Sequence, residues 1–410
     1  MKRIAVIGAG PAGMMAAGTA ANEGAKVTLF EKNQRPGRKL IITGKGRCNI
    51  TNNCDREKLL ANIVHNPKFL YSAFAAFSPN DTMEFFESRS VPLKTERGGR
   101  VFPVSDKAMD INDAMVGFVK KSGARIEQAN ITEIEVEDGC VRAVKSNKGR
   151  FECDCCVIAT GGASYPGTGS DGSGYKLAQS LGHTLVPISP SLVPMVCDGG
   201  ECARMQGLSL KNISITVKNS AGKTVYTDFG ELLFTHFGLS GPVILSASSH
   251  IDKKKDMPCT VSIDLKPALS EEQLDARILR EFSENMNKDF ENFLRKLLPK
   301  SMIDVVVARS GIMPYVKVNS ITRAQRESLV KLLKSFDLKL VDFRPINEAI
   351  VTAGGISVKE INPKTMESKL VKGLYFAGEV IDVDAHTGGY NLQIALSTGV
   401  CAGKAAAQDQ

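Results

Sequence analysis

The first thirty residues alternate between short apolar runs and one longer stretch that is rich in alanine. The runs Ile4–Ile7 and Val27–Phe30 are largely apolar, and the alanine-rich stretch between them ends near Gly24. Two apolar runs of strand length on either side of a helix-length segment are typical of a strand, a crossover helix and a parallel strand. This pattern predicts an α/β fold that begins with a β-α-β unit.

The hydrophobic period changes twice in the middle of the chain. Residues 188–267 read as short alternating strands separated by turns rich in glycine, asparagine and serine, which predicts a small barrel or sandwich. In residues 268–336 the apolar positions recur at helical spacing, and capping boxes at Ser270 and Thr322 mark two helix starts. We therefore expect a β-rich insertion that carries a helical subdomain, which serves either as a lid or packing module or as a docking site for a partner.

The two ends of the chain carry related patterns. Residues 126–156 are predicted to form a three-stranded antiparallel meander that leads into the apolar strand CVIAT. Near the other end, GLYFAGEVIDVDAHTGGYNLQIALSTG combines a strand, a glycine, an acid, a glycine pair and a helix. The predicted division is residues 1–187 and 345–410 for a Rossmann-like domain built from both ends, 188–267 and 337–344 for the β-rich domain, and 268–336 for the helical subdomain.

Length and composition restrict the kind of protein. A chain of 410 residues suits two or three folding units, and 43% hydrophobic with 23% charged residues is ordinary for a soluble globular protein. No export leader or membrane-length apolar run is apparent, so we expect a cytoplasmic protein without membrane contact. Its ten cysteines are then expected to be reduced thiols. A net charge of +8 without a basic and aromatic patch argues against a nucleic-acid partner.

The turn after the first strand has the glycine spacing of a dinucleotide site. Gly8 allows a sharp turn, Gly10 lets backbone amides approach a diphosphate, and Gly13 lets helix and strand pack closely. Glu31 ends the second strand, where its carboxylate can accept hydrogen bonds from an adenosine ribose and would repel a 2′-phosphate. The site is predicted to take FAD or NAD rather than NADP.

The C-terminal pattern favours FAD. An NAD dehydrogenase does not need a C-terminal segment to complete its dinucleotide site, whereas a flavoprotein of the two-dinucleotide-binding type does. In such a fold the acid after the strand holds the ribityl chain, and the helix after the glycine pair directs its positive end at the flavin pyrimidine. A second G-x-G-x-x-G motif, residues 167–172, lacks an acid-tipped strand after it and is interpreted as a flexible loop over the active site. NADH or NADPH would then reach the flavin transiently, through the substrate cavity.

Six segments together resemble the signatures of the YhiN/BaiN-type family of bacterial flavoproteins, which includes aminoacetone oxidases and bile-acid 3-oxo-Δ4 reductases. They are GRKLIITGKGRCNITN, GRVFP, ATGGASYPGTGSDGSGY, LLFTHFGLSGP, TAGGIS and GEVIDVDAHTGGYNLQ. The resemblance runs nearly from end to end. It implies FAD held by a Rossmann-like domain assembled from both chain ends, with a β-rich domain and a small helical domain inserted, and it does not imply one substrate.

The residues expected to contact FAD lie in these motifs. Residues 44–47 are expected to approach the diphosphate and the flavin edge, with Lys39 or Arg47 adding positive charge and Asn49 and Asn52 fixing the loop through backbone hydrogen bonds. The predicted cofactor contacts are Gly8, Gly10, Pro11, Ala12, Gly13, Glu31, Lys32, Lys39, Gly44, Gly46, Arg47, Cys48, Ile131, Thr160, Gly161, Gly378, Glu379, Asp382, Gly389, Tyr390, Asn391 and Leu392.

Few side chains are candidates for the chemistry itself. His386, two residues before the C-terminal glycine pair, could relay a proton beside the flavin or simply order the loop. His236 could reach the cofactor from the inserted domain or be a satisfied core residue. Tyr165, Tyr390 and Arg100 are expected to line the cavity, with packing or a salt bridge as the alternative for each.

The cysteines suggest neither redox catalysis nor a metal site. Cys48 follows the basic Arg47, which can lower the pKa of a thiol, but disulfide reductases use two cysteines a few residues apart. The nearest other cysteine, Cys54, is six positions away, so a structural role for Cys48 is favoured. The remaining cysteines lack paired zinc spacing, and no metal is expected.

Three classes of function stay open at this point. The leading class is an FAD-dependent oxidoreductase of a small or medium organic substrate, either an NAD(P)H-driven reductase of an activated double bond that acts through flavin N5 or an oxygen-dependent amine oxidase. The second class is a flavoprotein that modifies RNA. The third is a flavin-binding sensor or scaffold without turnover.

Overall fold

A computed structural model describes residues 1–408 and divides the chain into two compact units. The first unit combines residues 1–191 with the segment that begins at Ile346. The second unit comprises residues 192–345. The chain therefore leaves the first unit once and returns to it once, so both chain ends contribute to a single unit.

A five-stranded parallel sheet forms the centre of the first unit. Its strands follow the order β20-β11-β1-β2-β7. Their bounds are β1 (Arg3–Ile7), β2 (Lys26–Glu31), β7 (Arg125–Gln128), β11 (Cys155–Ile158) and β20 (Leu374–Phe376). β11 lies beside both β1 and β20, so a strand from the C-terminal segment completes a sheet begun at the N-terminus. All four residues of β11 are buried, as expected for a strand covered on both faces.

The structure corrects the predicted meander at its first strand. Residues 125–128 form β7, which pairs in parallel with β2 rather than with the meander. The antiparallel meander consists of β8 (Ile131–Glu137), β9 (Cys140–Ser146) and β10 (Gly149–Glu152). Its two turns lie where the sequence predicted them. The error arose because a four-residue strand has no pattern that distinguishes a parallel partner from an antiparallel one.

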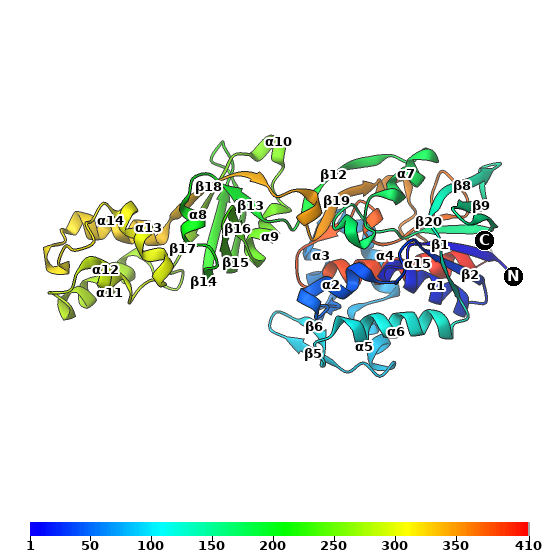
Figure 1. Ribbon diagram of the computed structural model, residues 1–410, viewed down its shortest axis with the longest axis horizontal. Coiled ribbons are helices and arrows are strands. Elements are labelled where there is room, and N and C mark those ends of the chain that lie inside the picture. Colours follow the sequence, from blue (N-terminus) through cyan, green and yellow to red (C-terminus); the bar gives the residue numbers. More distant parts are fainter. Residues whose placement is uncertain (409–410) are drawn as a thin grey trace. The chain divides into compact units, whose positions relative to one another are not determined.

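Two helices from opposite ends of the chain pack against each other beside this sheet. They are α1 (Pro11–Asn22) and α15 (Tyr390–Ala407), seen in blue and red in Figure 1. Gly399 and Gly403 of α15 face the backbone of α1: a Cβ at Gly399 would lie 2.5 Å from the Ala12 oxygen, and one at Gly403 would lie 2.4 Å from the Ala16 oxygen. Glycine therefore permits a backbone approach that no other residue allows.

Shorter elements surround the sheet in the first unit. β3, β6 and β5 form one antiparallel sheet, β4 pairs with β21, and β12 pairs with β19. The bounds are α2 (Arg38–Gly46), β3 (Thr51–Asn52), α3 (Arg56–Ala61), β4 (Ile63–His65), α4 (Tyr71–Ala76), α5 (Pro79–Glu87), β5 (Leu93–Glu96), β6 (Arg100–Pro103), α6 (Ala108–Lys121), α7 (Ser173–Ser180), β12 (Leu185–Ser191), β19 (Val351–Ile356) and β21 (Asp384–Ala385).

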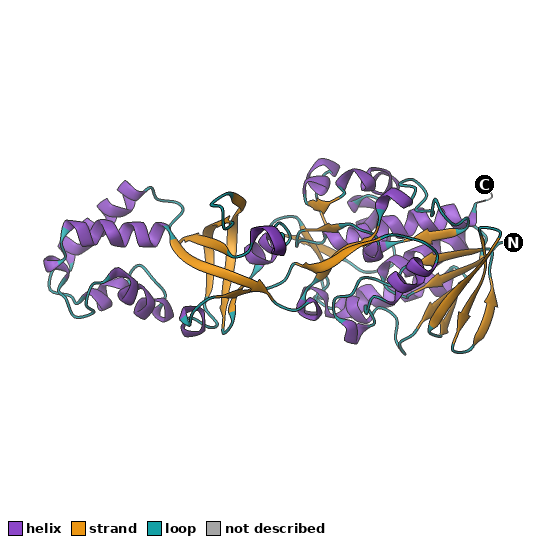
Figure 2. Cartoon of the chain, turned by 90° about the horizontal axis from the view of Figure 1, so that it is seen from above, coloured by secondary structure: helices purple, strands orange, loops and turns teal. Residues whose placement is uncertain are grey.

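The β-rich part of the second unit is a closed barrel, which decides between the two predicted alternatives. The strand order is β13-β16-β15-β14-β17-β18. The bounds are β13 (Met195–Cys197), β14 (Ser209–Lys218), β15 (Thr224–Thr235), β16 (Gly238–Ser240), β17 (Cys259–Asp264) and β18 (Phe336–Phe343), drawn as orange arrows in Figure 2. Ile213, Ile215 and Val217 of β14 are buried at alternate positions, as the period of two predicted.

The helical part of the same unit follows the predicted period. It contains α11 (Glu271–Glu284), α12 (Phe290–Leu294), α13 (Lys300–Ser310) and α14 (Arg323–Lys334), while the barrel carries α8 (Glu201–Arg204), α9 (Pro242–Ser248) and α10 (Lys253–Asp256). Both capping boxes are confirmed, at Ser270 with Gln273 and at Thr322 with Gln325. Phe336, predicted on the last helix, instead begins β18. Among residues 1–408, none of the helices combines the length and apolar character that crossing a bilayer requires.

The contact between α1 and α15 yields a prediction about stability. Gly399→Ala places a Cβ against rigid backbone and should lower the free energy of unfolding by about 1–3 kcal/mol. Gly117→Ala is the matched control, because Gly117 lies inside α6 and a Cβ there meets nothing within 4 Å. That control should raise stability by about 0.5–1 kcal/mol. Thermal melting of both variants measures the difference, and equal shifts would contradict the proposed backbone contact.

Candidate functional site

The turn between β1 and α1 is built by glycines with different roles. Gly8 has a φ of +100°, and a Cβ at Gly13 would lie 1.8 Å from the Gly8 oxygen. Strand and helix are therefore in backbone contact. Gly10, by contrast, has nothing within 4 Å of the position of a Cβ, so its backbone faces open space. This is the place where a ligand can approach the main chain closely.

Two helices begin with backbone N–H groups that no side chain caps. α1 starts after Gly10 with Pro11 at its first position, and α15 starts after Gly389. Neither start has a side-chain cap or an acidic residue in its first turn. A helix start carries unsatisfied N–H groups and about half a positive charge. Both starts therefore suit an anionic ligand group.

Glu31 sits at the end of β2 with its carboxylate largely buried. Its Oε2 accepts a hydrogen bond from the Ala9 amide at 2.8 Å, and its Oε1 accepts from the amide and the side chain of Asn33. A carboxylate has about four acceptor positions, so one of them is open to a hydroxyl donor. The carboxylate thus orders the glycine turn and has capacity for a ribose.

The second glycine motif is tied to the segment after β2. Lys32 pairs with Asp171 at 2.7 Å, and Asn33 donates to the carbonyl of Thr168 at 3.2 Å. Residues 166–168 form one turn of 3-10 helix, and α7 follows directly. The next strand after α7 is β12, which pairs antiparallel with β19 and is not part of the parallel sheet. The motif is therefore part of the first dinucleotide unit and does not start another one.

The acid after β20 forms the main ion pair of the site. Lys39 reaches Glu379 at 2.8 Å, although 340 positions separate them in sequence. Glu379 also accepts hydrogen bonds from the Ser164 hydroxyl at 3.1 Å and from the Thr352 amide at 2.9 Å. Gly378, with a φ of +76°, places this carboxylate in reach. The pairing makes Lys39 a positioning group for Glu379.

The glycine-rich loop adopts backbone conformations that most residues avoid. Gly44, Lys45, Gly46 and Cys48 all have a positive φ, from 57° to 82°. Strain of this kind clusters at ligand sites. Asn49 and Asn52 fix the loop through backbone hydrogen bonds as expected, because Asn49 accepts from Val101 and Asn52 donates to Gly98 and Gly388.

Two predicted residues of this loop face protein groups. Arg47 forms ion pairs with Glu96 and Asp106 and lies 4.2 Å from the ring centre of Phe102. Its hydrogen bond is the main reason that the pKa of Glu96 is lowered. Cys48 is fully buried, and burial raises the pKa of its thiol to about 12. A thiol with that pKa is protonated near neutral pH, so Cys48 is no redox nucleophile.

Other predicted cofactor residues occupy three places. Thr160 and Gly161 follow β11, and the buried Thr160 hydroxyl has no hydrogen-bond partner. Ile131 begins β8 in the meander. Gly389 requires glycine, because a Cβ there would lie 2.3 Å from the Thr51 oxygen. Tyr390, Asn391 and Leu392 follow in the first turn of α15, where Asn391 bonds both backbone groups of Ala385.

The predicted catalytic side chains come from separate elements of the chain. His386 faces Asn62, with Nδ1 and Oδ1 3.2 Å apart, which orders the loop before the glycine pair. Burial raises the pKa of Tyr390 to about 12. Arg100 of β6 lies 3.9 Å from Glu96 of β5. His236 lies in the turn between β15 and β16 of the second unit. Tyr165 is partly exposed.

The sequence reasoning missed a pair of residues beside the glycine pair. His65 of β4 contacts Asp384 of β21, with Nδ1 and Oδ1 2.5 Å apart. Ser191, the last residue of β12, donates to the other Asp384 oxygen at 2.7 Å. Asp384 was visible in the motif DVDAH, but nothing in the sequence pointed to His65, which lies 319 positions away.

A second missed residue is Gln393, which anchors the start of α15. Its Oε1 accepts hydrogen bonds from Thr51 and Thr82, and its Nε2 donates to Ser397 and to the backbone oxygen of Phe77. The side chain is completely buried. This network joins the first turn of α15 to β3 and α5 and fixes the direction of its N-terminal amides.

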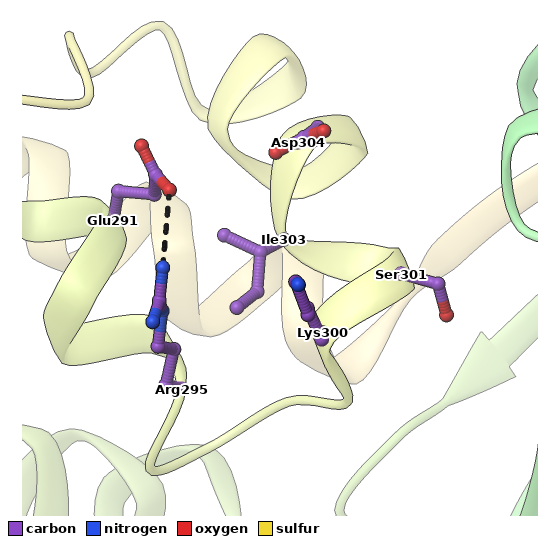
Figure 3. A pocket seen from close by; sticks show the side chains of 6 residues that line it. All are labelled: Glu291, Arg295, Lys300, Ser301, Ile303 and Asp304. Atoms are coloured by element: carbon purple, nitrogen blue, oxygen red, sulfur yellow. Dashed lines mark ion pairs between the residues drawn. The ribbon is translucent and has the colours of Figure 1, made fainter.

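The second unit contains a charged surface hollow of about 430 Å³. Figure 3 shows its side chains, which come from α12, α13 and the segment between them. Glu291 and Arg295 form an ion pair across one side at 3.7 Å. The mixed charges do not match a flavin or another apolar ring. In the described residues, no group of three or more histidines, cysteines and acidic residues is placed to hold a metal ion.

The residues of the first unit fit FAD. The open backbone at Gly10 and the uncompensated start of α1 suit the diphosphate, and Glu31 suits the ribose. The start of α15 suits the negative charge of a reduced flavin ring. Glu379, which is held by Lys39, Ser164 and Thr352, has a carboxylate that could accept a hydrogen bond from a ribityl hydroxyl.

Comparison with known proteins identifies the family to which the chain is similar. The family described as the HI0933-like protein Rossmann domain matches residues 2–405. The 3-dehydro-bile acid delta(4,6)-reductase of Clostridium scindens is 33% identical, and the match covers 100% of both chains. The ribosomal RNA dihydrouridine synthase of Escherichia coli is 31% identical, and the match covers 96% of this chain and 95% of the relative.

Solved structures agree at the level of the fold. The 3-ketosteroid delta1-dehydrogenase of Sterolibacterium denitrificans aligns with a TM-score of 0.53 at 12% identity, covering 99% of this chain and 100% of that one. The Mycobacterium smegmatis Sdh1 complex aligns with a TM-score of 0.51 at 18% identity, covering 99% of this chain and 68% of that one. The resemblance to YhiN/BaiN-type flavoproteins is thereby confirmed, and the chain belongs to the HI0933-like Rossmann family of FAD-dependent oxidoreductases.

Proposed function

We propose that this enzyme reduces a carbon–carbon double bond conjugated to a carbonyl group, with NADH or NADPH as the electron donor. The observation that carries the proposal is the chemistry shared by the two kinds of relative. One is named as a reductase of delta(4,6) double bonds in a 3-dehydro bile acid, and the other as a dihydrouridine synthase. Both names describe saturation of a double bond activated by a neighbouring carbonyl.

Residues of the first unit would hold the cofactor for this reaction. Bound FAD supplies a hydride from flavin N5. The amides after Gly10 would bind its diphosphate, Glu31 its ribose, and Glu379, held by Lys39, its ribityl chain. Amides at the start of α15, fixed by Gln393, would stabilise negative charge on the ring.

The topology supports a single binding place at the flavin, which the nicotinamide donor and the substrate would occupy in turn. In residues 1–408, the parallel pairings between named strands all belong to the sheet β20-β11-β1-β2-β7. That sheet provides one dinucleotide unit, which FAD would occupy. A nicotinamide nucleotide would therefore bind at the flavin in turn with the substrate, in a ping-pong cycle.

A second candidate is reduction of uridine in RNA, favoured by the near-complete match to the dihydrouridine synthase. The charge distribution of the helical subdomain gives it limited support. Arg277, Arg323 and Arg326 pair with acids of the same subdomain, and Lys317 pairs with Asp289. Basic side chains that already face acids add little to phosphate binding. We therefore favour a small conjugated carbonyl compound as the substrate.

Half-reactions under anaerobic conditions can identify the electron donor and the electron acceptor independently of each other. Mixing the FAD-loaded protein with NADH or NADPH should bleach the flavin within seconds, and a 3-oxo-Δ4 steroid should then restore its colour. Stopped-flow absorbance measures both steps, and product analysis measures the saturated ketone. Uridine-containing RNA and aminoacetone serve as alternative probes. Recolouring by RNA alone would favour the second candidate, and bleaching by aminoacetone would favour an amine oxidase.

The diphosphate site has its own test. Gly10→Ala adds a Cβ that meets no protein atom within 4 Å, so the apoprotein should keep its unfolding free energy within about 1 kcal/mol. The same methyl group blocks backbone approach to the diphosphate, and the affinity for FAD should fall at least about tenfold, or 1.4 kcal/mol. Flavin fluorescence titration measures the affinity. Gly117→Ala should bind FAD normally, and an unchanged affinity in Gly10→Ala would contradict the assignment.

A further inference from the structure

We propose that His65, held by Asp384, donates the proton that accompanies hydride transfer to the substrate. The inference rests on the proposed function, since saturation of a double bond needs one hydride and one proton. Neither His65 nor Asp384 was among the residues expected from the motifs. Their arrangement suits a proton donor, because Nδ1 of the ring is bound to a buried carboxylate while the His65 side chain is half-exposed.

The carboxylate of Asp384 is enclosed by protein. Its side chain is 1% exposed, whereas that of His65 is 47% exposed. One Asp384 oxygen lies 2.5 Å from His65 Nδ1, and the other accepts the hydroxyl of Ser191 at 2.7 Å. Both oxygens are thus engaged, which fixes the carboxylate and orients the ring. Nε2 is left as the nitrogen available to a substrate, and the structure gives it no partner among the described residues.

Backbone pairing places His65 beside the loop that leads into α15. β4 and β21 are antiparallel, with His65 opposite Asp384 and Ile63 opposite Ala385. The pairing continues at Asn62, whose backbone oxygen accepts from the His386 amide at 3.0 Å. Three residues after Ala385 comes the glycine pair that begins α15, the helix whose start fits the flavin ring. His65 is therefore anchored to the segment that carries the ring-binding amides.

The electrostatic surroundings favour a protonated imidazole. The charged groups that face His65 are Asp384 on β21 and Asp382 just before it. The hydrogen bond to Asp384 is the main cause that raises the pKa of His65 above its ordinary value, and both carboxylates add to it. Asn66, the next residue, donates to the Asp382 carboxylate at 2.9 Å. The protonated pair stabilises the fold below about pH 6.5, and this contribution is lost as pH rises through the raised pKa.

The proton balance of the step is complete. The hydride adds to the carbon β to the carbonyl, and the electrons of the double bond move toward the carbonyl. The proton of His65 Nε2 forms the second C–H bond at the α carbon, which leaves a neutral imidazole. The exposed ring then regains a proton from solvent, and the nicotinamide donor supplies the two electrons for the next cycle.

Tyr390, another titratable candidate, is less suited to this role. Burial raises the pKa of Tyr390 to about 12, so its hydroxyl is a weak acid near neutral pH. His65, by contrast, pairs with a buried carboxylate.

The test compares the two half-reactions in His65→Gln and Asp384→Asn. Both substitutions keep a hydrogen-bonding group of similar size. In His65→Gln, bleaching by the nicotinamide nucleotide should stay within about twofold of the wild type, while recolouring by a 3-oxo-Δ4 steroid should slow by about 10²-fold or more. In the wild type, the recolouring rate should fall as pH rises through the pKa of His65. In Asp384→Asn, that fall should move to lower pH.

A readout without cofactor or turnover tests the same pair. In the apoprotein, the NMR titration midpoint of the His65 ring should lie above that of an ordinary histidine and should drop in Asp384→Asn. His250→Gln is the matched control, because His250 stacks on Tyr226 in the second unit, with ring centres 4.7 Å apart. It should leave both half-reactions unchanged. FAD content and melting temperature verify that each variant is folded.

The outcomes are distinguishable. Recolouring of His65→Gln at the wild-type rate across pH would overturn the role of His65 and leave the proposed function standing. A His65 midpoint at or below that of an ordinary histidine would overturn the paired arrangement. If no conjugated carbonyl compound recolours the wild-type protein, the proposed function fails and this assignment fails with it.

Discussion

Close approach of backbone to backbone is the constraint on which the first unit depends. At Gly13 the helix α1 touches the turn at Gly8, and at Gly399 the helix α15 touches α1. Each contact leaves no room for a Cβ. Because both contacts involve α1, they bring the first and last helices of the chain beside the same sheet. A binding site composed of both chain ends follows from this packing.

The same packing exposes two helix starts whose charge the protein does not neutralise. α1 and α15 both begin after a glycine, and neither has an acidic residue in its first turn. Elsewhere in the site, opposite charges are matched: Lys39 meets Glu379, and Arg47 meets Glu96 and Asp106. An enzyme that binds a diphosphate and stabilises a reduced flavin needs helix starts whose positive charge is not already paired with an acidic side chain. The paired groups are fixed by one another, and the helix starts remain for the ligand.

Buried polar groups also fix the positions of side chains in the candidate site. Gln393 holds the first turn of α15 with four hydrogen bonds, and Asp384 holds His65 from the opposite side of a two-stranded pairing. A buried carboxylate is costly unless it is bonded, and Ser191 and His65 supply both bonds. Ser191 is also the last residue before the chain leaves for the second unit. The second unit thus begins directly after a residue that donates a hydrogen bond to Asp384.

The choice of FAD rested on motifs from both chain ends and on the family resemblance, whereas the sequence by itself determined the α/β class, a β-rich insertion with its helical part and the glycine turn at Gly8. These features are local, because glycine spacing, hydrophobic period and capping residues act within one or two turns of chain. Only the tertiary structure decided that residues 125–128 join the parallel sheet, that Arg47 is matched by two acids, and that Cys48 is a buried thiol. The pairs Lys39 with Glu379 and His65 with Asp384 span 340 and 319 positions. No local pattern encodes such pairs, because they form only when the packing of α1 against α15 has brought the two chain ends together.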